Sequence, residues 1–208
     1  MILTKLKQSG FLLRTEDGSL FAFDAGSETP VSALPVAIQA AFVSHHHGDH
    51  FSEENVESIG KAYVARDIVE RSPQLEATAL VDGEPVQDGP LTVTPFPVSH
   101  GSAAPDIVNL GFLIEADGKR LLFLGDIKEP SPAPEGPFDA VLVPVSGKYV
   151  FDPSQAFEYV QTLGEVKLLL PIHFDGSFTD EVAYEFEALA KGKYRVAILK
   201  MGDEITIS

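Results

Sequence analysis

The chain has no cysteine among its 208 residues. Disulfide bonds and thiolate metal ligands are therefore excluded, so a metal site has to use histidine, carboxylate or backbone ligands. Together with an N-terminus that lacks the long apolar core of a secretory signal, the absence of cysteine favours a cytoplasmic protein. No apolar run approaches the roughly 20 residues that a membrane span needs, so we expect no membrane partner.

Basic residues are scarce, with 15 lysines and arginines against 31 aspartates and glutamates and a net charge of −16. A protein that grips polyanionic nucleic acid usually has a basic face, and none is visible in this sequence. We therefore do not expect nucleic acid as a partner. The acidity is also compatible with a role in solubility or with a salty habitat, and the sequence does not separate these.

Apolar residues are plentiful: 44% of the chain is hydrophobic, and 14 residues are phenylalanine. A chain of this length and composition can bury a sizeable core. Predicted strands and helices follow one another without an internal repeat and without a linker long enough to divide the chain. We therefore predict a single domain spanning residues 1–208.

Four of the six histidines lie between residues 44 and 50, in the pattern His45-x-His47-x-Asp49-His50. Imidazoles and carboxylates at this density are costly to place side by side unless a cation binds them. A divalent metal is the simplest such cation. A solvated histidine-rich loop or a purification tag is the alternative, but a tag lies at a terminus and this cluster is internal.

The residues on either side predict a rigid frame for this cluster. Residues 40–43 form an apolar run that is typical of a buried strand. Ser52 is suited to cap a short helix, and Gly60 is suited to end it. Strand, ligand loop and helix together favour a metal site.

Further candidate ligands stand at or just after the ends of other predicted strands. They are His100 after 91–98, Asp126 after 120–124 and His173 after 167–172. Asp24, after residues 20–23, is expected to support the ligands from behind rather than to bind metal itself. Sheet-based enzymes place their chemistry at the C-terminal ends of strands. A lone histidine after a strand is commonly structural, but several independent segments here converge on one kind of chemistry. We therefore predict that they form one site.

This ordered set of motifs resembles the metallo-β-lactamase superfamily of dinuclear metallohydrolases. The resemblance extends from Asp24 to His173, and its most specific part is the His-x-His-x-Asp-His motif of residues 45–50. It implies an α/β fold, a four-layer αββα sandwich in which two sheets pack face to face with helices outside. It also implies two divalent metals. The first would be held by His45, His47 and His100, the second by Asp49, His50 and His173, and Asp126 would bridge them.

The resemblance also implies hydrolysis by a hydroxide that bridges the metals, with a small ester, lactone or phosphodiester as substrate. Asp49 would orient the hydroxide and take its proton. Zinc is expected, and manganese or iron would fit as well, because all the ligands are nitrogen or oxygen. In the family, the aspartate that matches Asp24 braces the metal loop. His46 has no matching role, and we expect it to face solvent or to support the site from behind.

Differences from known branches of the superfamily narrow the choice of branch for this chain. The chain lacks the cysteine of the true β-lactamases, and His47 replaces the glutamate of the di-iron flavoprotein branch. Residues 170–174 and 146–156 make the chain most similar to the small stand-alone branch that includes the ascorbate-6-phosphate lactonase.

Two other functions remain open at this stage. A nuclease or RNA-processing phosphodiesterase would use the same metals, but the acidic balance and the lack of a basic arm count against it. A metal-binding scaffold or regulator without catalysis is the second alternative. Such relatives usually lose ligands, whereas all seven are present here. The oligomeric state and the identity of the substrate are left open.

Lys148 and Tyr149 follow an apolar strand predicted over residues 140–145 and should therefore lie near the metal edge. Gly147 gives the preceding turn the freedom to aim the next side chain inward. We expect Lys148 or Tyr149 to bind an anionic group of the substrate or to stabilise the leaving group. The alternative is that Lys148 is a solvated loop lysine.

The remaining elements are predicted from caps and apolar runs. Asp152 and Gln155 form a box-like helix start, and Thr179 is predicted to cap the final helix. Later strands are predicted over residues 108–115, 195–200 and 204–207.

Overall fold

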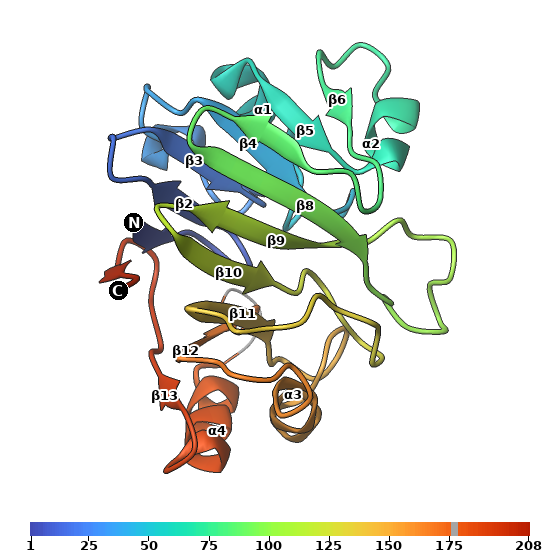
Figure 1. The fold of residues 1–208 in the computed structure, drawn as a ribbon. Coiled ribbons are helices and arrows are strands. Elements are labelled where there is room, and N and C mark those ends of the chain that lie inside the picture. The colour runs from blue at the N-terminus through green and yellow to red at the C-terminus, as the bar shows by residue number, and fades with distance from the viewer. Residues whose placement is uncertain (176–178) are drawn as a thin grey trace.

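The computed structural model describes residues 1–175 and 179–208, and these form two β-sheets that pack face to face (Figure 1). Each sheet has seven strands among the described residues. The first sheet has the order β14 (Glu204–Thr206), β1 (Ile2–Lys5), β2 (Phe11–Arg14), β3 (Leu20–Phe23), β4 (Ala40–Val43), β5 (Ala62–Val64), β6 (Thr78–Ala79). The second has the order β13 (Arg195–Val196), β12 (Leu168–Ile172), β11 (Ala140–Pro144), β10 (Lys119–Phe123), β9 (Leu110–Ala116), β8 (Leu91–Pro97), β7 (Val86–Asp88).

Helices cover both outer faces of the sheet pair. Helices α1 (Glu53–Ile59) and α2 (Arg66–Arg71) lie beside the first sheet, and α3 (Pro153–Val160) and α4 (Glu181–Ala190) lie beside the second (Figure 1). A short 3₁₀ turn, Val31–Ala33, precedes β4. The predicted αββα sandwich is confirmed. Among the described residues, none of the helices has the length and apolarity that crossing a membrane requires.

Aromatic side chains from both sheets form the core between them. Phe11, Phe23 and Phe42 come from the first sheet, and the rings of Phe11 and Phe23 stack at 4.6 Å. Phe112 and Phe123 come from the second sheet, 6.1 Å from Phe23 and 5.6 Å from Phe11 respectively. All five are fully buried. Burial of such large rings is the dominant favourable contribution to joining the two sheets.

The direction of the strands explains why the candidate ligands meet. Strands β3, β4 and β5 run parallel in the first sheet, and β10, β11 and β12 run parallel in the second. The C-terminal ends of parallel strands lie at one edge of a sheet. The loops that follow β3, β4, β10, β11 and β12 therefore gather at one edge of the sandwich.

Two predicted helix starts are confirmed. Ser52 Oγ accepts the backbone N–H of Asn55 at 3.3 Å, and Gly60 ends α1 in the left-handed conformation. Asp152 and Gln155 form a reciprocal capping box at the start of α3, with bonds of 2.8 and 3.1 Å.

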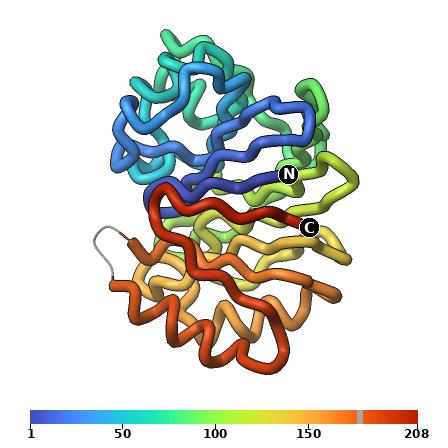
Figure 2. The backbone as a smooth tube through the Cα atoms, turned by 90° about the vertical axis from the view of Figure 1, so that its left-hand side faces the viewer, coloured from blue at the N-terminus to red at the C-terminus, as the bar shows by residue number. Residues whose placement is uncertain are grey.

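The end of the chain differs from the prediction in two places. Thr179 is not the cap of α4, because Asp180 occupies that position and its carboxylate pairs with Lys200 instead of capping the helix. The strand predicted over residues 195–200 ends at Val196, because the chain then leaves the second sheet. It crosses to the first sheet, where β14 pairs with β1 and the two termini lie side by side (Figure 2).

A smaller correction concerns β9. The strand predicted over residues 108–115 begins at Leu110. Asn109 lies outside it, and its side chain donates to the backbone carbonyl of Asp126 at 3.0 Å.

Asn55 joins helix α1 to the segment that follows β3. Its buried side-chain amide donates to the carbonyls of Ala25, Gly26 and Thr29 at 2.9, 3.0 and 2.9 Å. Gly26 packs directly on the histidine-rich loop, since a Cβ there would lie 2.1 Å from the backbone of Asp49. Asn55 thus holds this segment against the loop that carries the ligands.

Asn55→Ala is expected to lower the free energy of unfolding by about 1–3 kcal/mol, because three buried carbonyls lose their donor. Urea unfolding followed by circular dichroism measures this change. Glu57→Ala is the control, an exposed substitution in the same helix, and should cost less than about 0.5 kcal/mol. Equal losses in the two variants would contradict the role of Asn55.

Candidate metal centre

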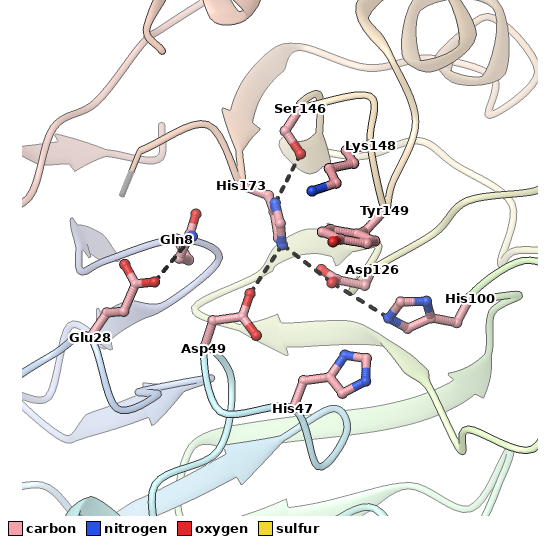
Figure 3. A pocket seen from close by; sticks show the side chains of 10 residues that line it. All are labelled: Gln8, Glu28, His47, Asp49, His100, Asp126, Ser146, Lys148, Tyr149 and His173. Atoms are coloured by element: carbon pink, nitrogen blue, oxygen red, sulfur yellow. Dashed lines mark hydrogen bonds and ion pairs between the residues drawn. The ribbon is translucent and has the colours of Figure 1, made fainter. Parts of the chain in front are cut away.

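Seven candidate ligand side chains come together at the strand-end edge of the sandwich, and five of them surround the cavity in Figure 3. The loop after β4 carries His45, His47, Asp49 and His50. The other three follow strands of the second sheet: His100 after β8, Asp126 after β10 and His173 after β12. The structure thus brings together the seven side chains that the strand ends and the family resemblance indicated.

The first of two ligand groups consists of His45, His47, His100 and Asp126. One potential ligand atom from each lies within 4.8 Å of all the others. His45 Nε2 lies 3.1 Å from His47 Nδ1. Asp126 Oδ2 lies 3.8 Å from His45 Nε2 and 3.7 Å from His100 Nε2.

The second group consists of Asp49, His50, Asp126 and His173, again within 4.8 Å of one another. His173 Nε2 lies 3.2 Å from Asp49 Oδ2 and 3.3 Å from Asp126 Oδ2. His50 Nε2 lies 3.0 Å from Asp126 Oδ1. Asp126 belongs to both groups and presents one oxygen to His50 and the other to His173.

The donor set fits bound cations. His50 Nε2 and Asp126 Oδ1 are buried and face each other at 3.0 Å, and the buried His100 Nε2 lies 3.7 Å from Asp126 Oδ2, with no hydrogen-bond partner of good geometry among the described residues. Burying polar atoms without well-aligned partners is costly. Here they converge on the same space, where a cation would satisfy them together. Nitrogen and oxygen ligands without sulfur suit zinc, manganese or iron.

Asp24 holds two of the histidines from behind. Its Oδ1 accepts the backbone N–H of Ser44 at 2.7 Å, and its Oδ2 accepts the Ser44 hydroxyl and lies 2.7 Å from His50 Nδ1. Because the Ser44 hydroxyl donates to Asp24, it accepts from His45 Nδ1, 3.0 Å away. In both histidines these contacts occupy Nδ1 and direct Nε2 toward the cluster, where it can serve as a metal ligand once the ring is neutral.

His173 is oriented in a similar way. Its Nδ1 lies 3.0 Å from Ser146 Oγ, so its Nε2 faces Asp49 and Asp126 (Figure 3). Its backbone N–H donates to the carbonyl of Gln8 at 3.2 Å, although the residue itself adopts a positive φ of 57°.

Opposite charges set the protonation of the cluster. Burial alone would raise the pKa of Asp126, but His173 and His50 beside it hold that pKa well below its usual range. Burial lowers the pKa of His50, yet Asp126 and Asp24 together raise it well above its usual value. By contrast, burial and then the nearby His50 hold the pKa of His45 well below its usual value. The carboxylates thus draw positive charge into the cluster, which protons or metal cations supply.

His46 is the one histidine of the loop that lies outside both groups. Its Nδ1 lies 2.6 Å from Asp67 Oδ2 in helix α2. We expected His46 to face solvent or to support the site from behind. In the structure its side chain pairs with Asp67 and so links the histidine-rich loop to α2.

The cavity in front of the cluster has a volume of about 810 Å³ and is lined in part by residues outside the ligand set. Lys148 and Tyr149 both line it, as their position after β11 predicted, and Lys148 Nζ lies 4.7 Å from the centre of the Tyr149 ring. Sequence reasoning missed Gln8 and Glu28, which line the cavity beside Asp49 (Figure 3). No sequence signal marked them, because Gln8 lies in the turn between β1 and β2 and Glu28 lies in a turn after β3.

Comparisons with known proteins identify the family of this chain. Residues 2–173 match the model of the family described as "Beta-lactamase superfamily domain". Igni18, a metallo hydrolase from the hyperthermophilic archaeon Ignicoccus hospitalis, is 20% identical with a TM-score of 0.74, over 98% of this chain and 97% of that one. The metallo-β-lactamase fold protein YhfI from Bacillus subtilis is 16% identical with a TM-score of 0.79, over 99% of each chain.

A third similar structure contains a metal. Zn²⁺-bound PqqB from Methylobacterium extorquens is 14% identical with a TM-score of 0.74, over 96% of this chain and 87% of that one. At these identities the structural likenesses establish the fold alone, whereas the family match spans most of the chain. The chain therefore belongs to the metallo-β-lactamase superfamily of metallohydrolases.

Proposed function

We propose that the protein is a dinuclear metal-dependent hydrolase of a small anionic ester, lactone or phosphodiester. The observation that carries this proposal is the pair of ligand groups that share Asp126. In this proposal His45, His47 and His100 hold one metal, Asp49, His50 and His173 hold the other, and Asp126 serves both. Zinc is the metal we propose, with manganese or iron as alternatives that the same donors accept.

When bound, two divalent cations lower the pKa of a water and polarise a carbonyl or phosphoryl oxygen. Asp49 is the carboxylate placed to handle the proton of the attacking water. Its side chain is 27% exposed and lines the cavity, whereas that of Asp126 is 2% exposed. Burial tends to raise the pKa of Asp49, but the hydrogen bond with His173 keeps it below its usual value. An ionised carboxylate at this position can orient a water and accept its proton.

Lys148 and Tyr149 supply the second part of the proposal, the binding of a substrate anion. Both line the cavity next to His173 and Asp126 (Figure 3). In a chain with a net charge of −16, a lysine in the cavity is a specific source of attraction for an anion. The cavity volume suits a small molecule.

The finer placement of the protein is also a proposal. We place it in the branch that includes the ascorbate-6-phosphate lactonase, as a single cytoplasmic domain over residues 1–208. The similarity of residues 170–174 and 146–156 and the small size of the chain support the branch. The lack of cysteine supports the cytoplasmic location.

Protein purified without chelator and supplemented with zinc is expected to contain close to two metal ions per chain, because the ligand set is complete for two. Elemental analysis measures the ratio. His46→Ala is the control and should keep both ions, since His46 pairs with Asp67 outside the ligand groups. A reproducible ratio near zero would refute the metal centre, and a ratio near one would refute its dinuclear form.

Asp49→Asn is expected to reduce turnover roughly 10²–10⁴-fold while the fold stays intact, because the amide keeps the volume but cannot take a proton. The rate is measured on the best substrate from a panel of lactones, para-nitrophenyl esters and bis(para-nitrophenyl) phosphate. Circular dichroism checks the fold. Near-native turnover in this variant would show that Asp49 does not have the proposed role.

Lys148→Ala is expected to raise KM or lower kcat for a phosphorylated or carboxylated substrate without changing the metal content. The loss should be about 1.5–3 kcal/mol in kcat/KM if a charge-assisted hydrogen bond is removed. Tyr149→Phe tests the phenol separately, and Lys191→Ala is a charge-matched control at an exposed position. Unchanged kinetics in both Lys148→Ala and Tyr149→Phe would assign this turn a purely structural role.

A further inference from the structure

Lys128 lies two residues after Asp126 and reaches the turn that carries Lys148 and Tyr149. Its Nζ donates to the carbonyl of Gly147 at 2.7 Å and to that of Val150 at 3.0 Å. These two carbonyls stand on either side of the Lys148–Tyr149 pair. One ammonium group therefore closes the turn, and hydrogen bonds from a charged donor are stronger than neutral ones.

The same residue also contacts the turn that carries His100. The backbone N–H of Lys128 donates to the carbonyl of Ser99 at 2.8 Å. Gly101 has a φ of +95°, and a Cβ there would lie 2.9 Å from Lys128 Cγ. Glycine at this position thus leaves room for the aliphatic stem of Lys128 to pack against the His100 turn.

The turn of residues 147–150 has backbone hydrogen bonds of its own. Gly147 N–H donates to the carbonyl of Phe151 at 3.0 Å, and Phe151 N–H donates to the carbonyl of Ile127 at 2.9 Å. These bonds fix the base of the turn next to Lys128. The ammonium of Lys128 adds the contacts that fix both ends of the Lys148–Tyr149 pair.

We propose that Lys128 is a positioning residue that fixes Lys148 and Tyr149 against the ligand cluster and so sets the affinity for the substrate anion. The consequence for anion binding rests on the role proposed above for Lys148. Among the described residues, Lys128 does not line the cavity, and its Nζ donates to two backbone carbonyls. Lys128 therefore acts through the turn and does not itself contact the substrate.

The structural part of the proposal is tested by hydrogen exchange of the metal-loaded protein. Lys128→Met keeps the aliphatic stem and removes the ammonium, so the amides of residues 147–151 are expected to exchange faster. Lys128→Arg keeps a cationic donor and should retain more of the protection. Lys191→Met is the control, since it removes one charge from an exposed lysine at the end of α4. Unchanged exchange in Lys128→Met would overturn the proposal.

The functional part is tested with an anionic and a neutral substrate. For bis(para-nitrophenyl) phosphate, Lys128→Met is expected to raise KM roughly tenfold, because the loss of a supporting contact displaces the residues that bind the anion. The metal content should not change. KM for para-nitrophenyl acetate should stay close to that of the control. An equal rise for both substrates would overturn the proposal.

A double variant separates this inference from the function on which it rests. If Lys128 acts through Lys148, then adding Lys128→Met to Lys148→Ala should raise KM for the phosphodiester no further. A further rise of the same size that persists when Tyr149→Phe is also present would show that Lys128 acts by another route and would overturn the proposal. If Lys148→Ala alone leaves KM unchanged while Lys128→Met still speeds exchange at residues 147–151, the anion-binding role of Lys148 fails and the structural role of Lys128 stands.

Discussion

The buried carboxylate of Asp126 lies between four histidine rings. The geometry of the candidate metal site depends on how these rings surround it. Its two oxygens lie within 3.0–3.8 Å of nitrogens from His45, His50, His100 and His173. An ionised carboxylate is expensive to bury unless opposite charge compensates it. In this structure His173 and His50 supply that charge, since they hold the pKa of Asp126 well below its usual range.

Two residues of the site, Asp24 and His173, adopt strained backbone conformations that orient their side chains. Asp24 and His173 both have positive φ angles, 44° and 57°, which cost free energy for residues other than glycine. Each is held by several hydrogen bonds: Asp24 by Ser44 and His50, and His173 by Gln8 and Ser146. The left-handed conformation turns the chain sharply at the strand end, so the side chain faces the cluster and the backbone continues outward.

The accuracy of sequence reasoning varied with the range of the interaction. The caps of α1 and α3 were predictable because Ser52 and Asp152 bind groups three residues away. The cap of α4 was predicted wrongly because the pairing of Asp180 with Lys200 spans 20 residues. The strand over residues 195–200 was predicted too long because β-propensity does not reveal where a chain must change sheets.

The sequence by itself indicated the candidate ligands and their order, because each follows an apolar run predicted as a strand and the ordered motifs resemble those of a known family. Only the tertiary structure decided which residues support those ligands. The pairing of His46 with Asp67, the placement of Gln8 and Glu28 in the cavity wall and the closure of the 147–150 turn by Lys128 all join segments that lie far apart in the chain. Such contacts have no periodicity and no local motif, since they depend on how the loops fold over the strand ends.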